Sequence, residues 1–309
     1  MILSKEILTK FKIQRKVRKN LAKLKSFCNS NSLNTVSVNN ICNYKNSDTL
    51  CVLASGNSIN RISEEEWRFI KKNDSASLNN TILHKHIPTY LFYETDSNQK
   101  SHLELNKLKF ENLKLRSEEL QKSAIIWHYQ EKRYFDLQLL IDNNLIHNSF
   151  FQGSYSLPGE SKDELDNSLI IAHKNGLTKK PEVGLYRRGS LARIVHFAIA
   201  MHYKKVIFFG ADLNGPEYFF DSYQDEDFPK GCKPPVLQNY IYNSREGKKK
   251  QDKIHMTVDP SVHPVTMINV IERMNKKWCK PDGLILEVFN SDSALADILE
   301  ISANMDSSI

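Results

Sequence analysis

Small, amide and hydroxyl side chains follow several apolar runs of this sequence, at the points where strands are expected to end. The candidates for ligand binding in these groups are Gly56, Asn57, Ser58, Asn79, Gly210, Asp212, Asn290 and Ser291. Small polar groups of this kind, most of them uncharged, can hydrogen-bond a nucleobase, a sugar or a phosphate. Any one group alone is better explained as a turn, because turns favour Asn, Gly and Ser. Together the groups predict a neutral polar crevice that binds a ligand.

Ser190 stands where an apolar helical pattern begins. The hydroxyl and the free N–H groups of a helix N-terminus bind phosphate well, and a plain N-cap is the alternative role. Asp212 is a single carboxylate at its strand end, which makes a poor site for a divalent ion. We therefore expect neither a metal nor a cofactor. The fingerprints of dinucleotide-binding and P-loop proteins do not occur, which argues against both chemistries.

His263 is the histidine whose position best fits a general base. Pro264 follows it and is favoured in the first turn of a helix, so we expect His263 near an N-cap. The positive end of the helix would keep the imidazole neutral and able to accept a proton. A surface capping role is the alternative. His255, in the polar segment before it, is a competing candidate.

Strand-like and helix-like patterns alternate through residues 49–309. The expected strands are 49–54, 75–78, 90–93, 124–127, 206–209 and 284–288. The expected helices are one from Ser63, one over 103–121, one from 190, one from 263 and one that ends at 299. This order predicts an α/β fold with one mostly parallel sheet and helices on both faces. Ligands in such folds bind outside the carboxyl ends of the strands. Residues 96–183 receive no functional assignment.

The positive charge is concentrated at the N-terminus. Residues 1–27 carry nine basic side chains and one acidic one, a net of +8, whereas the remainder has a net charge of −1. A nucleic-acid-binding body would carry its basic patch on the fold itself, so no nucleic acid is expected as a partner. The apolar residues of 3–27 recur at helical spacing, which predicts a basic amphipathic helix. It could bind an anionic membrane surface, or pack on its own domain or a second subunit.

The same patterns predict the domain limits and the cellular location of the protein. Residues 1–48 are expected to be the helix and a linker, residues 49–309 the ligand-binding domain, and residues 219–262 a lid or loop. No apolar run is long enough to cross a bilayer, and no secretory signal is evident. The five cysteines form no CxxC pair and suit free thiols in a reducing compartment. We expect a cytoplasmic protein, peripheral on the inner face of a bacterial inner membrane.

The order of the motifs resembles that of bacterial sialyltransferases of glycosyltransferase family 42. The residues that carry the resemblance are Gly56-Asn57, Asn79, Ser190, the block from Tyr203 to Asp212, Tyr218, His263 and residues 289–291. The resemblance covers about residues 49–300, and its strongest part is the 190–212 block. Departures occur at Ser58, where the family has glycine, at Ile59-Asn60, where it has Pro-Ser, and at Leu191, where it has glycine.

The resemblance implies a Rossmann-like, GT-A-like nucleotide-sugar domain with a lid. It implies transfer of sialic acid from its CMP donor to a glycan hydroxyl with inversion and without a metal, as in lipooligosaccharide biosynthesis. Asn57, Asn79 and Ser190 would hold the cytidine nucleotide, Tyr218 would donate to the leaving phosphate, and His263 would be the base. The family's first phosphate-binding tyrosine has no counterpart here, and Asn214 is nearest to its place.

Other functions stay open at this point. The donor could be CMP-Kdo or another CMP-activated nonulosonic acid, because each needs a similar cytidine pocket. A diphosphokinase-like enzyme related to pterin pyrophosphokinases would share the Gly-Asn and Gly-x-Asp strand ends. A non-enzymatic adaptor at the membrane surface would need only the N-terminal helix. The expected partners are the donor, a glycan acceptor that could be lipid-linked, the anionic membrane and further copies of the chain in a homo-oligomer.

Overall fold

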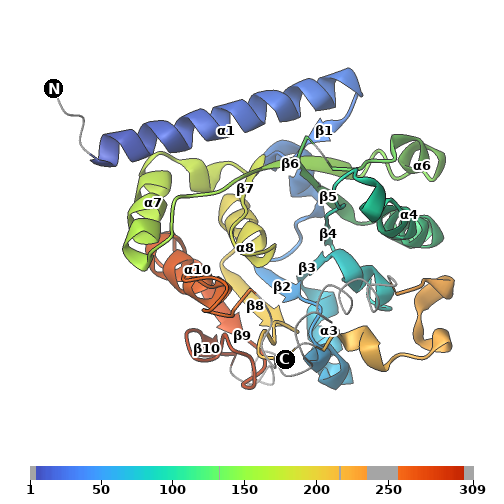
Figure 1. Ribbon diagram of the computed structural model, residues 1–309. Helices are drawn as coiled ribbons and strands as arrows, with labels where there is room; N and C mark the ends of the chain where they lie inside the picture. The colour runs from blue at the N-terminus through green and yellow to red at the C-terminus, as the bar shows by residue number, and fades with distance from the viewer. Residues whose placement is uncertain (1–4, 132, 216, 235–256, 303–309) are drawn as a thin grey trace.

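The computed structural model describes residues 5–131, 133–215, 217–234 and 257–302, and its centre is one parallel sheet (Figure 1). The strands run in the order β1-β6-β5-β4-β3-β2-β8-β9-β10, and β7 also pairs with β6. Their bounds are β1 Asn34–Thr35, β2 Thr49–Leu53, β3 Asp74–Leu78, β4 Tyr90–Tyr93, β5 Ala124–Tyr129, β6 Ser149–Tyr155, β7 Val183–Leu185, β8 Lys205–Phe209, β9 Ile285–Val288 and β10 Glu300–Ile301. All ladders between these strands are parallel. Strands buried on both faces read as continuous apolar runs, which is why most of them could be recognised in the sequence.

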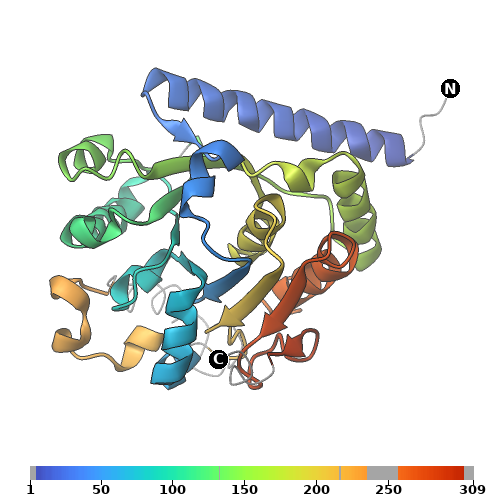
Figure 2. The same cartoon turned by 180° about the vertical axis from the view of Figure 1, so that it is seen from behind.

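Helices cover both faces of the sheet, which confirms the α/β prediction (Figures 1 and 2). One face packs against α7 Lys162–Lys174, α8 Leu191–Ala200 and α10 Met267–Met274. The other packs against α3 Glu64–Lys72, α4 Lys100–Leu115, α5 Ser117–Leu120 and α6 Leu137–Asp142. Side chains alternate between the faces, so that Val52 belongs to the first core and Leu53 to the second. Shorter helical turns are η1 Cys42–Tyr44, η2 Asn57–Arg61, η3 Asn79–Leu83, η4 Leu177–Lys179 and η8 Asn275–Cys279.

The order of the strands reverses between β2 and β8. From β2 the chain builds outward through β3, β4, β5 and β6, and it then returns through α8 to place β8 on the other side of β2. At such a point the connections leave in opposite directions, so a crevice opens at the carboxyl ends of the two strands. The loops that begin at Ala54 and at Gly210 lie there.

The N-terminal helix is part of the domain and not a separate arm. Helix α1, Lys5–Ser30, lies along β6 and α7 (Figure 1), and it buries Ile13, Val17, Leu24 and Cys28. Ile13 and Val17 join the core on one face of the sheet, whereas Leu24 and Cys28 join the other, because the helix crosses the sheet edge. Of the alternatives for this helix, packing on its own domain is therefore correct for its inner face.

The expected linker over residues 29–48 is wrong. It contains β1, which pairs with β6, and the short helix α2, Val38–Ile41, whose start is capped by Ser37. Val36 and Ile41 are fully buried. Polar Asn and Ser residues here form caps and turns rather than a flexible connection. Within the described residues, none of the helices combines the length and apolar composition that crossing a bilayer requires.

Two further segments differ from expectation. Residues 219–234 of the expected lid form packed turns, namely η5 Phe219–Ser222, η6 Asp225–Asp227 and η7 Pro229–Gly231, and the rings of Phe219, Phe220 and Phe228 are buried. The part of that lid over 235–256 lies outside the described residues. The expected helix that ends at 299 is a series of turns instead. Residues 128–183, in which the sequence predicts no strand or helix, hold α6, β6, α7 and the start of β7.

Candidate functional site

A polar crevice of about 250 Å³ opens at the carboxyl ends of β2, β3 and β8, at the point where the strand order reverses. Six residues predicted from the sequence line it, namely Gly56, Asn79, Ser190, Gly210, Asp212 and Tyr218. They come from four separate segments, which the parallel sheet and the start of α8 bring together. The crevice is not neutral as expected, because Arg188, Asp212 and Glu217 also line it.

Close backbone packing shapes the floor of the crevice. A Cβ atom at Gly56 would lie 2.5 Å from the Asp212 Oδ2 atom and 2.5 Å from the Gly210 carbonyl, so only glycine fits. Gly210 has a φ of 66°, and a Cβ atom there would meet Ile59 at 2.5 Å. The Asp212 carboxylate accepts hydrogen bonds from the backbone N–H of Ser58 at 2.9 Å and from its hydroxyl. Ser58 and Asp212 therefore join the loops after β2 and β8.

The N-terminus of α8 faces the crevice without a side-chain cap. Ser190 occupies the N-cap position, but its hydroxyl donates to the Glu94 carboxylate at 2.6 Å instead of bonding to the helix. In the described part of the chain, the backbone N–H groups of Leu191 and Ala192 have no acceptor. Free N–H groups at the positive end of a ten-residue helix attract an anion. The plain N-cap role for Ser190 is therefore wrong.

Glu94 is the centre of a buried charged cluster behind Ser190. Its carboxylate is 7% exposed, accepts from Arg193 Nη1 at 2.7 Å, and lies 3.4 Å from His128 Nδ1 and 3.8 Å from Arg133 Nη2. Burial alone would raise the pKa of Glu94, but the adjacent His128 and the positive charges of Arg193 and Arg133 hold that pKa well below its ordinary value. Glu94 is thus ionised at neutral pH, and its carboxylate accepts a hydrogen bond from the Ser190 hydroxyl.

This arrangement fixes the hydrogen-bonding roles of two predicted residues. Because the Ser190 proton is committed to Glu94, the Ser190 Oγ atom offers only lone pairs to a ligand. Asn79 is the reverse case, since its Oδ1 atom accepts from the Glu94 backbone N–H at 2.8 Å. Its Nδ2 group has no partner among the described residues and lines the crevice as a donor. Ser190 therefore accepts from a ligand, and Asn79 donates to it.

Arg188 supplies a positive charge next to the helix N-terminus. Its φ of 62° is unusual for a residue with a side chain, and its Nε atom donates to the Val265 carbonyl at 2.8 Å. That bond anchors the side chain and leaves the remaining guanidinium N–H groups for an anion. Tyr218 lines the crevice nearby, and its ring stacks on that of Phe220 at 5.2 Å. These groups suit a phosphate at the mouth of α8.

Other predicted residues lie beside the crevice but do not line it. Asn57 donates to Glu217 at 3.3 Å, and Asn214 donates to the Asp292 carbonyl. The Asn290 side-chain Oδ1 atom accepts from the Asp292 backbone N–H at 3.0 Å. Ser291 is exposed. The turn after β9 thus uses the Asn290 side chain for its own geometry, and the expectation that Asn290 and Ser291 line the crevice is not met.

His263 does not cap a helix, contrary to prediction. Helix α10 begins at Met267 and is capped by Thr266, whose hydroxyl accepts from the Asn269 N–H while Asn269 bonds back to Thr266. The reciprocal capping box places the N-cap three residues after His263. His263 is half-buried in a turn, where its backbone N–H donates to the Asp259 carbonyl at 3.0 Å, and it does not line the crevice. His255 lies outside the described residues.

Sequence reasoning missed Glu94, although a signal was present. Glu94 directly follows β4, so the strand-end rule that identified Asn79 and Asp212 would also have identified it. Arg193 gave no signal, because it sits within an otherwise apolar helix. A scan against protein-family models and a search of curated proteins gave no match to this chain. The geometry of the crevice therefore carries the functional argument.

Four histidines, which we call the neutral histidines, are kept uncharged by their surroundings. They are His84, His86, His128 and His196. Burial is the main cause in each case, and it lowers their pKa values from 6.5 to about 4, 3, 3 and 4 respectively. Nearby positive charges add to the effect at His128, where Arg193 opposes a second cation. A neutral His128 leaves Arg193 and Arg133 as the cations that face Glu94.

Proposed function

We propose that this protein is an inverting glycosyltransferase that moves a sialic acid, or a related nonulosonic acid, from its CMP-activated donor to a glycan hydroxyl. The observation that carries the proposal is the crevice at the strand-order reversal. It pairs an open helix N-terminus and Arg188 with an acceptor at Ser190 and a donor at Asn79. A phosphate and a nucleoside need these two kinds of surroundings side by side.

The reaction asks little of the protein beyond positioning and charge stabilisation. The acceptor oxygen attacks the anomeric carbon, the bond from that carbon to the CMP phosphate oxygen breaks, and the hydroxyl proton passes to a base. The N-terminus of α8, Arg188 and the Tyr218 hydroxyl would stabilise the negative charge on the leaving phosphate. In this proposal no metal is required, and general-base assistance contributes roughly 10²–10⁴ in rate.

The base is His263 or His255. His263 lies four residues before Met267 of α10, which lines the crevice, and the proposal places the base in this segment although His263 itself does not line the crevice. In the proposal, the donor-binding domain is Rossmann-like and of the GT-A type. His263→Ala should lower turnover by at least about 100-fold while CMP binding is kept. If His255→Ala has that effect and His263→Ala does not, the base is His255.

The donor class can be tested by ligand-induced stabilisation. The melting temperature would be measured with CMP, CDP, UDP, ADP and ATP, each with and without Mg²⁺, because a ligand that binds only the folded state stabilises it. Selective stabilisation by CMP that survives EDTA is expected, and Arg188→Gln should reduce it. Preference for ATP with Mg²⁺ would instead support a phosphotransferase. No stabilisation by any nucleotide would refute the proposal.

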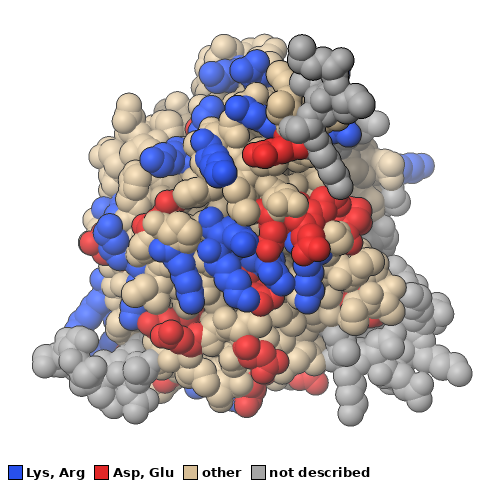
Figure 3. Space-filling model, turned by 90° about the vertical axis from the view of Figure 1, so that its left-hand side faces the viewer, with Lys and Arg blue, Asp and Glu red and all other residues tan. Residues whose placement is uncertain are grey.

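We also propose that the outer face of α1 holds the protein on an anionic membrane, so that lipid-linked glycans can serve as acceptors. Exposed basic side chains line this helix, namely Lys10, Lys12, Arg15, Lys16, Arg18, Lys19 and Lys25. Its first turns also expose Leu8 by 46% and Phe11 by 60%. On the face shown in Figure 3, basic side chains stand close to acidic ones over the middle of the molecule. Outside α1, Arg273 of α10 pairs with Asp166 of α7 at 3.1 Å.

A sedimentation assay with vesicles tests this location, which would be the inner face of a bacterial inner membrane. A variant with Lys10, Lys12 and Lys19 changed to Gln should lose binding to vesicles that contain an anionic lipid, while keeping its turnover of a soluble acceptor. The matched control changes three exposed lysines far from α1, namely Lys71, Lys72 and Lys114, to Gln. Equal binding of both variants would contradict the proposal.

A further inference from the structure

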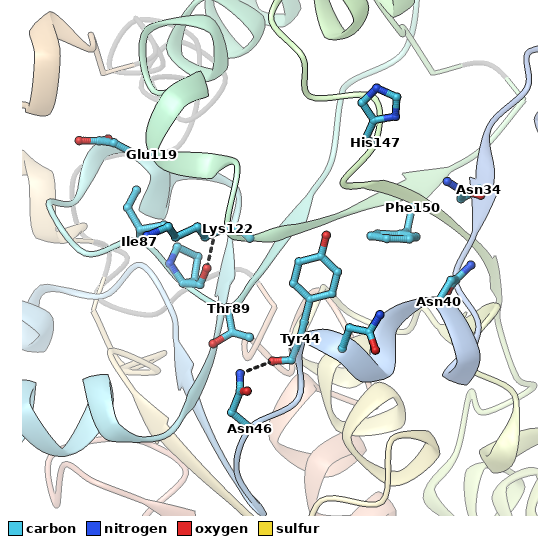
Figure 4. Close-up of a pocket in the computed structure, with 13 residues that line it drawn as sticks. Asn34, Asn40, Tyr44, Asn46, Ile87, Thr89, Glu119, Lys122, His147 and Phe150 are labelled. Atoms are coloured by element: carbon cyan, nitrogen blue, oxygen red, sulfur yellow. Dashed lines mark hydrogen bonds between the residues drawn. The ribbon is translucent and has the colours of Figure 1, made fainter.

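A second cavity of about 940 Å³ lies at the amino-terminal ends of the strands, on the side of the sheet away from the crevice (Figure 4). Thr89 precedes β4, Ser123 precedes β5, and Asn34 and Phe150 belong to β1 and β6. The cavity lies at the amino-terminal ends of the strands and the crevice at their carboxyl ends. The seven residues of β6 span roughly 20 Å at about 3.3 Å per residue, so the two sites are about one strand length apart. The two cavities share no lining residue. A ligand here would be separate from the one proposed to react.

Several polar groups of this cavity are fixed by bonds within the protein. The Asn40 side chain donates to the Thr35 carbonyl and accepts from the Ser37 N–H at 2.8 Å. Ser123 donates to the Pro88 carbonyl at 2.6 Å. These groups hold the wall in place and have little hydrogen-bonding capacity left for a ligand. The wall is therefore built before any ligand arrives.

Four other polar side chains of the lining are uncommitted. Among the described residues, the side chain of Asn34, the hydroxyl of Tyr44, the amine of Lys122 and the imidazole of His147 have no hydrogen-bond or ion-pair partner; Tyr44 is half-buried, and the other three are exposed at the rim. They come from four segments that are far apart in the sequence. In Figure 4 the Tyr44 ring stands near the middle of the lining, with Lys122, His147 and Asn34 around it. Donors and acceptors that converge on one volume without partners of their own are the pattern of a binding site.

We propose that this cavity binds a saccharide that carries a carboxylate. The Tyr44 ring packs edge-on against Phe150 at 5.9 Å, which offers an apolar surface next to a phenolic donor. Such a combination suits a sugar, which has apolar C–H faces and a rim of hydroxyls. Asn34 and His147 can each bond to those hydroxyls. The amide, phenol and ring groups thus account for recognition of a sugar rather than of a bare ion.

Lys122 is the reason that we propose a negatively charged ligand. The other charged residue of the lining is Glu119, and its carboxylate is already paired with Arg116 Nε at 2.6 Å. Lys122 is therefore an uncompensated cation at the rim of the cavity. Burial raises the pKa of Tyr44, so that its hydroxyl stays protonated and does not repel an anion. A carboxylate on the sugar would complete the site.

The experiment compares sialyllactose with lactose, which differ by one carboxylate-bearing sugar. Binding to the full chain would be measured by calorimetry with saturating CMP, which fills the crevice if the proposed function is right. We expect sialyllactose to bind and lactose to bind at least about fivefold more weakly. Lys122→Gln should reduce sialyllactose binding to the level of lactose, Tyr44→Phe should weaken both sugars, and Lys114→Gln on the outside of α4 should have no effect.

Several results would overturn the inference. One is the absence of sialyllactose binding at millimolar concentration. Another is binding that Ser190→Ala or CMP abolishes while Lys122→Gln does not, because the sugar would then occupy the crevice. Equal, Lys122-dependent binding of inorganic phosphate would show an anion site rather than a saccharide site. Lys122 is exposed, so its variant should fold normally. The result for this cavity is independent of whether CMP binds at all, which separates the two proposals.

Discussion

The Glu94 cluster gives a prediction whose size can be worked from the structure. Glu94→Gln keeps the shape of the side chain and an oxygen that can still accept from Ser190 and Arg193, but it removes the negative charge. Arg193 is fully buried, and its remaining partner is the side-chain Oε1 atom of Gln152, to which Nε and Nη2 both donate at 3.1 Å. Removing one partner of a buried ion pair costs about 3–5 kcal/mol. Because the acceptor oxygen is retained, we expect a loss of about 3 kcal/mol in the free energy of unfolding.

Urea denaturation at pH 7 would measure this loss. The matched control is Glu160→Gln, whose carboxylate pairs with Arg187 at 3.2 Å but is 77% exposed. An exposed pair contributes about 0–1 kcal/mol, so the control should resemble the wild type. The pKa of Glu94 is held below its ordinary value, so its stabilisation is present above that value and is lost only as the pH falls through the folded-state pKa. The difference between variant and wild type should therefore persist down to moderately acidic pH.

A Glu94→Gln protein within about 0.5 kcal/mol of the wild type would refute the reasoning. That result would mean that Glu94 and Arg193 do not form a charged pair. The commitment of the Ser190 proton to an ionised Glu94 would then also fail. The assignment of Ser190 as an acceptor depends on that commitment, so the stability measurement tests the site as well as the fold.

Three further perturbations have clear expected outcomes. Gly56→Ala should abolish the stabilisation by CMP in the melting assay, because the new methyl would overlap Asp212, whereas Gly215→Ala, with open space around it, should keep it. Leu24→Ala should lower the free energy of unfolding by about 2–5 kcal/mol, measured in urea, if α1 belongs to the core, whereas exposed Lys25→Ala should not. The neutral histidines have pKa values below 6.5, so the unfolded state binds more protons and stability should fall as the pH drops from about 6.5 toward 4. Equal urea midpoints at pH 7 and pH 5 would show that these histidines do not stay neutral in the fold.

The strands and the crevice were predictable because each depends on local patterns. Apolar runs such as 49–54 and 206–209 are buried on both faces and end in residues that suit turns, so both their existence and their ends could be read. Parallel order then brings those ends together without any knowledge of side-chain contacts. Glu94 follows the same pattern, because it stands directly after β4, so the end of that strand also points to the crevice.

Features that depend on tertiary contacts were not predictable. Helix α1 has the composition of a surface-binding helix, and only the position of β6 decides that Leu24 is buried. The start of α10 was misplaced because Pro264 and Thr266 both signal a helix start, and the capping box of Thr266 determines where the helix begins. Arg193 occupies a core position that a hydrophobic residue would normally fill. Its partner comes from a strand about 100 residues earlier, which no local pattern reveals.

The polarity of Ser190 bears on which nucleotide the crevice selects. The 2′-hydroxyl of a ribose can donate a hydrogen bond, whereas a deoxyribose has no group there. A nucleotide with its phosphate at the N-terminus of α8 would bring its ribose, rather than its base, next to Ser190, which offers lone pairs because the serine proton is held by Glu94. Ser190→Ala should therefore weaken CMP binding by roughly fivefold and bring CMP and dCMP closer in affinity, as measured by calorimetry. If the variant binds both nucleotides more weakly by the same factor, Ser190 does not contact the 2′-hydroxyl.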